Sequence, residues 1–290
     1  MIKKMFFSVL ALSVIITSCS NDDDNNPNTP VNSPLTLNLS GLEDLGSDYV
    51  YEGWIIVDGA PISTGTFSSV TFPQTFMVST AQLNSATTFV LSIEPAIDSD
   101  PAPADTKVLA GDFSGNSANV NTGILGDFSN ASGAFFLRTP TDEGGMNNGN
   151  DENGVWFGTP GMPPVPNFNL PTLPDGWTYE GWVVGDSGPL TTGTFNVFDM
   201  ADDAAPFSET VQPGPPVPGE DFFLNEPAGE TFPLDIRNRT VVISVEPVPD
   251  NSPAPFAMKP LVGTAGMATA PAVHDFGQNL GSLPSGSVSR

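Results

Sequence analysis

The stretch YEGWIIVDGAPISTGTF, from Tyr51 to Phe67, decides the fold, because the chain repeats it as YEGWVVGDSGPLTTGTF from Tyr179 to Phe195. Bulky side chains stand on both faces of its first seven residues, which is typical of a central strand covered on both sides. Gly53 and Gly181 leave room for a neighbouring ring or backbone to approach. The Gly/Pro turn that follows leads into another strand, so each copy predicts a β-hairpin.

A second block of sequence is repeated further along the chain. FVLSIEPAIDSDPAPADTKVLAG, from Phe89 to Gly111, aligns with VVISVEPVPDNSPAPFAMKPLVG, from Val241 to Gly263. In FVLSIEP the alternation places Phe89, Leu91 and Ile93 on a core face and Val90, Ser92 and Glu94 on a wet face, and Pro95 ends the strand. A third block, at 127–138, faintly echoes the segment at 275–290. A repeat of more than about 100 residues indicates duplicated domains and not a solenoid.

Composition favours short strands over helices, because the chain has 30 prolines, 29 glycines and 20 phenylalanines and no sustained helical period. We therefore expect an all-β protein with two tandem Ig-like antiparallel β-sandwich domains that fold independently. The expected organisation is a signal peptide at 1–18, an acidic disordered tether at 19–33, unit one at 34–140, a Gly/Asn/Pro-rich connector with a short aromatic strand at 141–165, and unit two at 166–290, with a loop insertion at about 199–230.

The N-terminal segment predicts export and lipidation. Lys3 and Lys4 precede an apolar run that is too short to span a membrane. The ending ITSC resembles the lipobox of bacterial lipoproteins, which implies that Cys19, the only cysteine, carries a lipid anchor. The acidic residues after Cys19 resemble a surface-export signal; the alternative is a plain polar linker. We expect an outer membrane lipoprotein exposed at the cell surface, with a periplasm-facing position as the alternative.

The charge and the residue types limit the chemistry. A formal net charge of -25 disfavours nucleic acid as a partner and makes Ca²⁺ or a basic protein surface electrostatically easier to bind. The only histidine, His274, has no partner for a nucleophilic relay, so we expect no enzyme activity. The acidic turn at 147–154 lacks the EF-hand pattern. No catalytic residue, metal or cofactor is therefore predicted.

The two repeated blocks together resemble the extracytoplasmic C-terminal domain of anti-sigma-K factors. That domain pairs a Tyr-x-x-Trp strand and a Gly-Thr-Phe turn with a later Glu-Pro loop containing Pro-x-Pro. Both units carry these motifs in this order. The resemblance implies a compact β-sandwich and a role in the envelope. Because we expect neither a cytoplasmic sigma-binding domain nor a membrane span here, no direct contact with a sigma factor is expected.

The family-motif residues are expected to be mainly structural. The aromatic residues are core side chains, or alternatively a sugar-stacking platform. The repeated lysine either closes the Glu-Pro loop in an ion pair with the glutamate or contacts a ligand. The residues of these motifs are Tyr51, Trp54, Gly65, Phe67, Glu94, Pro95, Pro101, Pro103 and Lys107 in unit one, and Tyr179, Trp182, Gly193, Phe195, Glu246, Pro247, Pro253, Pro255 and Lys259 in unit two.

Two classes of function agree with these observations. The first is a non-enzymatic envelope lipoprotein whose duplicated domains bind or sense an envelope protein or an extracellular ligand, in a setting of sigma-factor regulation. The second is a structural or adhesive surface lipoprotein in which the sandwiches act as spacers. A pocket or exposed aromatic residues would favour binding, whereas smooth polar surfaces would favour the spacer.

Overall fold

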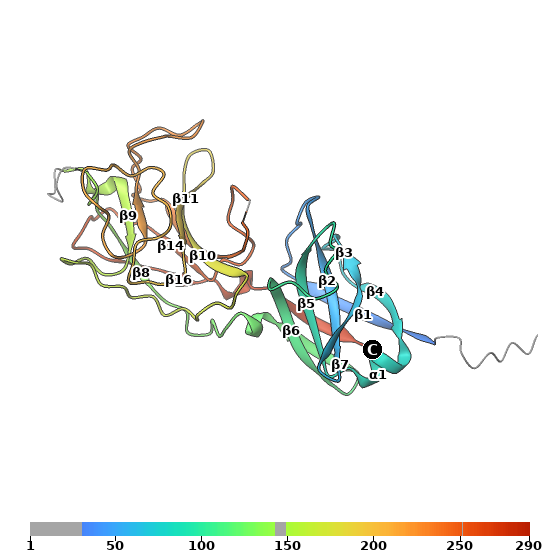
Figure 1. The fold of residues 1–290 in the computed structure, drawn as a ribbon. Helices are drawn as coiled ribbons and strands as arrows, with labels where there is room; N and C mark the ends of the chain where they lie inside the picture. Colours follow the sequence, from blue (N-terminus) through green and yellow to red (C-terminus); the bar gives the residue numbers. More distant parts are fainter. Residues whose placement is uncertain (1–30, 143–148, 251) are drawn as a thin grey trace, which may run out of the picture.

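A computed structural model describes residues 31–142, 149–250 and 252–290. Figure 1 shows two lobes, and the fold is nearly all-β, which confirms the predicted class. In the described part of the chain the only α-helix is α1, Thr80–Ser85, and no helix is long and apolar enough to cross a membrane. The 3₁₀ helices are η1 Thr122–Ile124, η2 Asp151–Asn153 and η3 Leu280–Ser282. The predicted signal peptide, Cys19 and most of the tether lie outside the described residues.

Lobe one is one antiparallel sheet of eight strands in the order β3-β2-β5-β6-β7-β17-β1-β4. The sheet curls so that its two edge strands approach, and the rings of Phe67 in β3 and Phe76 in β4 lie 5.8 Å apart. Apolar residues from β1, β2 and β5 fill the interior. The strands are β1 Asn32–Ser40, β2 Tyr49–Val57, β3 Ala60–Phe67, β4 Gln74–Ser79, β5 Thr88–Pro95, β6 Lys107–Ser114, β7 Ser117–Asn121 and β17 Ser285–Ser289.

Lobe two is a sandwich of two antiparallel sheets, β11-β10-β13-β14-β16 and β12-β9-β8-β15. The sheets pack through aromatic rings, because Phe157 of β9 lies 6.0 Å from Phe195 of β11 and against Gly181 of β10. The strands are β8 Ala134–Leu137, β9 Gly154–Phe157, β10 Trp177–Val184, β11 Pro189–Phe195, β12 Gly219–Asp221, β13 Thr240–Pro247, β14 Leu261–Thr264, β15 His274–Asp275 and β16 Gly277–Gln278.

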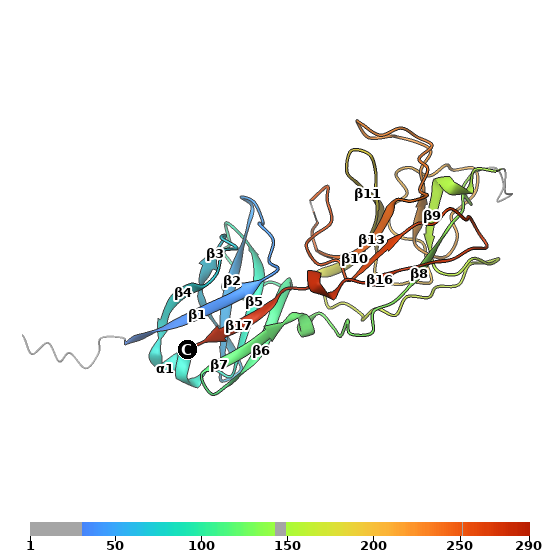
Figure 2. The same cartoon turned by 180° about the vertical axis from the view of Figure 1, so that it is seen from behind.

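The last strand of each sequence copy lies in the lobe of the other copy. β8 follows copy one but pairs with β9 and β15 of lobe two. β17 follows copy two but lies between β1 and β7 of lobe one (Figure 2). Its Val288 lies opposite Leu37 and Ala118. The two lobes therefore do not coincide with the units expected at 34–140 and 166–290, because the last strand of each copy pairs in the other lobe. Backbone hydrogen bonds alone define such a ladder, so either copy can supply the strand.

The repeated hairpin has the same irregularity in both copies. In lobe one Gly53 lies opposite Gly65, but the next residue, Trp54, lies opposite Ser63, so Thr64 forms a β-bulge. The φ angle of Gly65 is +118°, and that of Gly193 in the second hairpin is +114°, a backbone conformation that favours glycine. A Cβ added at Gly53 would lie 3.2 Å from the ring of Phe89. The predicted close approach at this glycine is thus confirmed.

The segment at 199–230, which the sequence predicts as a surface loop, is partly core. Its strand β12 pairs with β9, and Phe207, Val217 and Phe222 are buried. The rings of Phe207 and Phe222 stack at 5.6 Å. The loop prediction failed here because β12 is only three residues long and reads Gly-Glu-Asp, which shows no apolar alternation.

Candidate ligand-binding cleft

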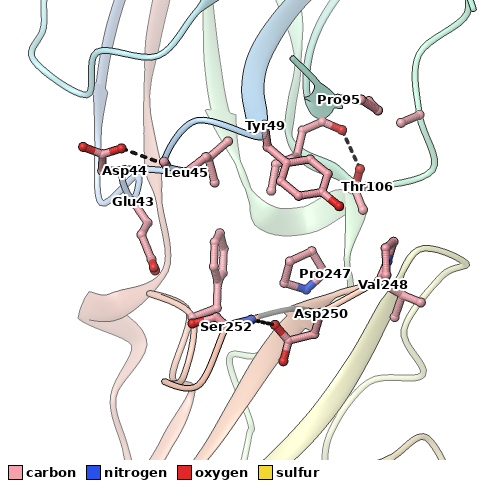
Figure 3. Close-up of a pocket in the computed structure, with 15 residues that line it drawn as sticks. Glu43, Asp44, Leu45, Tyr49, Pro95, Thr106, Pro247, Val248, Asp250 and Ser252 are labelled. Carbon is pink, nitrogen blue, oxygen red and sulfur yellow. Dashed lines mark hydrogen bonds between the residues drawn. The ribbon is translucent and has the colours of Figure 1, made fainter. Parts of the chain in front are cut away.

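The Glu-Pro segments of the two copies meet where the lobes join. They enclose a cavity of about 390 Å³, to which the loop before β2 also contributes. Figure 3 shows Tyr49 and Pro95 of lobe one facing Pro247 and Val248 of lobe two. Motifs that lie about 150 residues apart in the sequence therefore form one site.

A chain of hydrogen bonds connects the motif residues of lobe one. The Trp54 Nε1–H donates to Ser92 Oγ at 2.9 Å, and the Ser92 hydroxyl donates to the Glu94 carboxylate. The same carboxylate accepts the Ala104 backbone N–H at 2.9 Å. Burial raises the pKa of Glu94, and the hydrogen bonds from Ser92 and Ala104 oppose that rise. The Trp and Glu motifs therefore act together to hold the loop after Pro95 against the sheet.

Lobe two repeats this chain residue by residue. The Trp182 Nε1–H donates to Ser244 Oγ at 2.8 Å, Ser244 donates to Glu246, and Glu246 accepts the Phe256 backbone N–H at 2.9 Å. Burial raises the pKa of Glu246 to about 7, against the effect of these hydrogen bonds. The serine, which the sequence analysis did not single out, is the middle member of the chain in both lobes. The only sequence signal for it is that it recurs at the same place in both copies.

The repeated lysines hold the same loop from its other side. Lys107 Nζ donates to the Ala104 carbonyl at 2.9 Å, and Lys259 Nζ donates to the Phe256 carbonyl at 2.6 Å. Neither lysine lies within 4.0 Å of its copy's motif glutamate in the described structure. In place of the predicted Glu–Lys ion pair, the glutamate and the lysine of each copy contact the same residue, which is Ala104 in lobe one and Phe256 in lobe two. The glutamate accepts the backbone N–H of that residue, and the lysine donates to its carbonyl.

The walls of the cleft are mainly apolar and its rim is acidic. Glu43, from the loop before β2, accepts a hydrogen bond from the backbone of Ala257 in lobe two, so it connects the lobes. Burial raises the pKa of Glu43, and the nearby Lys259 opposes that rise. The apolar lining residues are Leu45, Tyr49, Ile93, Pro95, Ala104, Pro247, Val248, Pro249 and Phe256, and the acidic ones are Glu43, Asp44 and Asp250.

The motif tyrosines are buried and position the strands that precede the cleft. The Tyr51 hydroxyl donates to the Glu43 carbonyl at 2.9 Å and accepts the Glu43 N–H at 3.2 Å, which fixes the start of the cleft loop. The Tyr179 hydroxyl donates to the Pro171 carbonyl at 2.6 Å. Each tyrosine also stacks on the motif phenylalanine of its hairpin, Phe67 at 5.5 Å and Phe195 at 6.0 Å. These four rings are buried in the lobe cores and do not line the cleft.

The other predicted residues lie around the cleft or away from it. Pro101 and Pro253 are exposed at the tips of the Glu-Pro loops, and Pro103 and Pro255 are half-buried. His274 lies in β15, where its ring packs 5.4 Å from Phe135 and its Nε2 contacts the Ala268 carbonyl at 2.9 Å. It therefore has a packing role at the sheet edge, remote from the cleft residues.

The sequence motifs indicate neither the cleft loop nor the grouping of three carboxylates. Leu45 of the cleft loop and Tyr49 at the start of β2 belong to no repeated motif, and they form a site with lobe two only because the lobes dock against each other. Glu180, Glu246 and Asp250 each place an oxygen within 4.8 Å of the others, the one such group with the spacing of metal ligands in the described residues. Glu180 lies in β10 and the other two lie in and just after β13.

Comparison with known families decides which part of the chain has a recognised relative. Residues 30–108 match the family Anti-sigma-K factor rskA, C-terminal. The match confirms the resemblance for copy one, from β1 to the start of β6, and includes Tyr51, Trp54, Glu94 and Lys107. The anti-sigma-K-like nature of copy two stays a prediction that rests on the internal repeat. No curated protein and no solved structure matches the chain at a significant level.

Proposed function

We propose that this chain is a non-enzymatic envelope lipoprotein, anchored through Cys19, whose cleft binds an extended segment of a partner protein in the envelope. The anti-sigma-K factor family suggests a regulatory role related to sigma factors. One observation carries the binding proposal: the family motif of copy one and its repeat in copy two shape opposite walls of a single cavity. Ligand sites commonly lie at such domain junctions.

The lining indicates the chemistry of the bound segment. Tyr49, Val248 and Phe256 offer apolar and aromatic contact, while Asp44 and Asp250 give the rim a negative charge. Complementary charge steers encounter and selects partners, while buried apolar contacts supply most of the affinity. We therefore infer a segment with an apolar side chain that enters the cleft and a flanking lysine or arginine that contacts the rim.

A substitution that fills the cleft tests this proposal. Val248 is 49% exposed on the cleft wall, and Val197 is 49% exposed elsewhere on lobe two. A photo-crosslinking amino acid at position 49 should capture one partner from native envelopes. Val248→Trp should abolish the capture, whereas the matched Val197→Trp should leave it unchanged.

The outcome separates the two classes of function. Two results would contradict binding in the cleft. In the first, both tryptophan variants capture the partner equally well. In the second, neither the variants nor the parent protein captures any partner. Either result would favour the spacer, which needs no pocket. Capture that is lost only in Val248→Trp would support binding in the cleft. If the captured protein also acts upstream of a sigma factor, the regulatory role would be supported.

A further inference from the structure

We propose that Glu180, Glu246 and Asp250 form a calcium site in lobe two. Each residue contributes a carboxylate oxygen, and the three oxygens lie within 4.8 Å of one another. Two oxygens that bind the same Ca²⁺ at about 2.4 Å lie no more than about 4.8 Å apart, so one ion can bridge all three. Glu180 is 5% exposed and Glu246 is 0% exposed, so two of the ligands are fixed inside the lobe.

A second observation is independent of this clustering. The Oε1 atom of Glu180 accepts the Thr191 hydroxyl, but its Oε2 atom is buried without a hydrogen-bond donor, and the side chain that Glu180 faces is another carboxylate, Asp250. A buried carboxylate oxygen without a donor is costly. A cation beside Oε2 removes that cost, because it provides the positive partner that the protein does not.

The charges around the group point the same way. Within the described parts of the chain, no lysine or arginine lies within 4.0 Å of the carboxylates of Glu180, Glu246 or Asp250. Lys259, whose charge acts on Glu246, directs its Nζ to the Phe256 carbonyl at 2.6 Å. Three facing carboxylates repel one another, and a divalent ion neutralises most of their combined charge.

The donor set favours calcium among common metals. All three donors are carboxylates, which suit hard cations, whereas zinc sites in proteins are built mainly from cysteine and histidine. Ca²⁺ accepts 6 to 8 oxygens in flexible geometry, while Mg²⁺ requires a tighter octahedron. Asp250 also lines the cleft, so water can reach the ion from that side and complete its coordination.

Copy one provides a matched control. Its corresponding residues are Glu52, Glu94 and Asp98, which keep the same order in the repeat. Glu52 is only half-buried, and Asp98 is exposed. The described residues of lobe one contain no group with the spacing of metal ligands. The same substitution can therefore be made in both lobes, with a predicted effect in only one.

The test uses the purified full-length protein, first stripped of metal with a chelator. Ca²⁺ is titrated by calorimetry, and Tb³⁺ luminescence is excited through tryptophan, since Trp182 connects to Glu246 through Ser244. The parent protein should bind one Ca²⁺ per chain. Glu180→Gln, which keeps the side-chain shape, should weaken binding at least tenfold, and Asp250→Asn should also weaken it. Glu52→Gln should leave binding unchanged.

Thermal stability provides a readout that does not depend on the titration. Ca²⁺ should raise the unfolding midpoint of the parent protein and of Glu52→Gln, but not that of Glu180→Gln. In chelator, Glu180→Gln should be at least as stable as the parent protein, because it removes a buried negative charge; this also shows that the variant folds. Absence of saturable binding up to about 10 mM Ca²⁺, above the usual range for extracellular modules, would overturn the proposal. Two other results would also overturn it. One is that Glu52→Gln weakens Ca²⁺ binding as much as Glu180→Gln does. The other is that Ca²⁺ leaves the unfolding midpoint of the parent protein unchanged, as expected if Glu180 and Asp250 share a proton and bind no ion.

Discussion

At the scale of single residues, the motifs of this chain are explained by a hydrogen-bond chain and not by separate roles. Trp54 and Glu94 are 38 and two residues away from Ser92 along the sequence, and each bonds to its hydroxyl. The loop beyond Pro95 is held in place because the last hydrogen bond of this series joins the Glu94 carboxylate to the backbone N–H of Ala104. A motif that looks like two unrelated signals in the sequence is thus one structural unit.

The serine at the centre of this chain should be important for stability. Ser92→Ala leaves the buried Trp54 N–H without an acceptor and removes a donor from Glu94. An unsatisfied buried polar group costs about 1–3 kcal/mol, so the free energy of unfolding should fall by about that amount in urea titrations. The exposed Ser117 of β7 provides the control, because Ser117→Ala should change stability by less than about 0.5 kcal/mol. Equal effects of the two substitutions would contradict the role of the chain.

At the scale of elements, the short strand β12 anchors the segment at 199–230 to lobe two. Phe222 follows β12 directly and is fully buried, with its ring stacked on Phe207. Phe222→Ala should cost about 3–5 kcal/mol, as is typical for truncating a buried phenylalanine. Leu224→Ala, at a residue that is 40% exposed, should cost much less. A small effect of Phe222→Ala on the thermal midpoint would restore the interpretation of this segment as a dispensable loop.

The same strand carries carboxylates that should make stability depend on pH. Burial raises the pKa of Glu220 to about 8 and that of Asp221 to about 7, and the neighbouring Asp202 has a pKa of about 8 for the same main reason. In the unfolded chain these carboxyl groups titrate near pH 4. The folded protein therefore binds more protons than the unfolded chain does between about pH 4 and 8. Stability is therefore greatest at the acidic end of this window and falls as the pH rises through it.

Measurement of the thermal midpoint between pH 5 and pH 8 checks this sign. The midpoint should fall across the range, and Glu220→Gln should make the decline shallower because it removes one of the titrating groups. Glu226→Gln, at an exposed residue of the same segment, should leave the slope unchanged. A midpoint that rises with pH over this range would contradict the assignment of raised pKa values to the β12 cluster.

At the scale of the whole molecule, the sequence predicted the parts of the fold that carry a repeated apolar pattern. The central strands with Tyr51 and Tyr179, the hairpins with Gly65 and Gly193, and the all-β class follow from such patterns. The exchange of β8 and β17 did not, because β17 reads SGSVS and buries one apolar side chain, Val288. The cleft was also beyond the sequence, since it depends on how the lobes dock.

The exchanged strands should join the two lobes into one cooperative unit. Val288 is fully buried between β1 and β7, although it lies only two positions before Arg290. Val288→Asp places a charge in that core and should lower the unfolding midpoint of the whole molecule in a single calorimetric transition. Ser289→Asp, at the exposed neighbouring position, should have little effect. Two separate transitions, with that of lobe two unshifted, would contradict the coupling of the lobes.

The exchange also sets the order in which the protein can be completed during synthesis. The strand β1 is synthesised early, yet one of its neighbours in the finished sheet, β17, lies about 250 residues further along and follows every other described strand. Contacts so distant along the chain form late, because a long loop must close before they are made. Lobe one is thus begun first and finished last. A nascent chain therefore leaves lobe one incomplete, with an edge of β1 unpaired, until β17 has been synthesised.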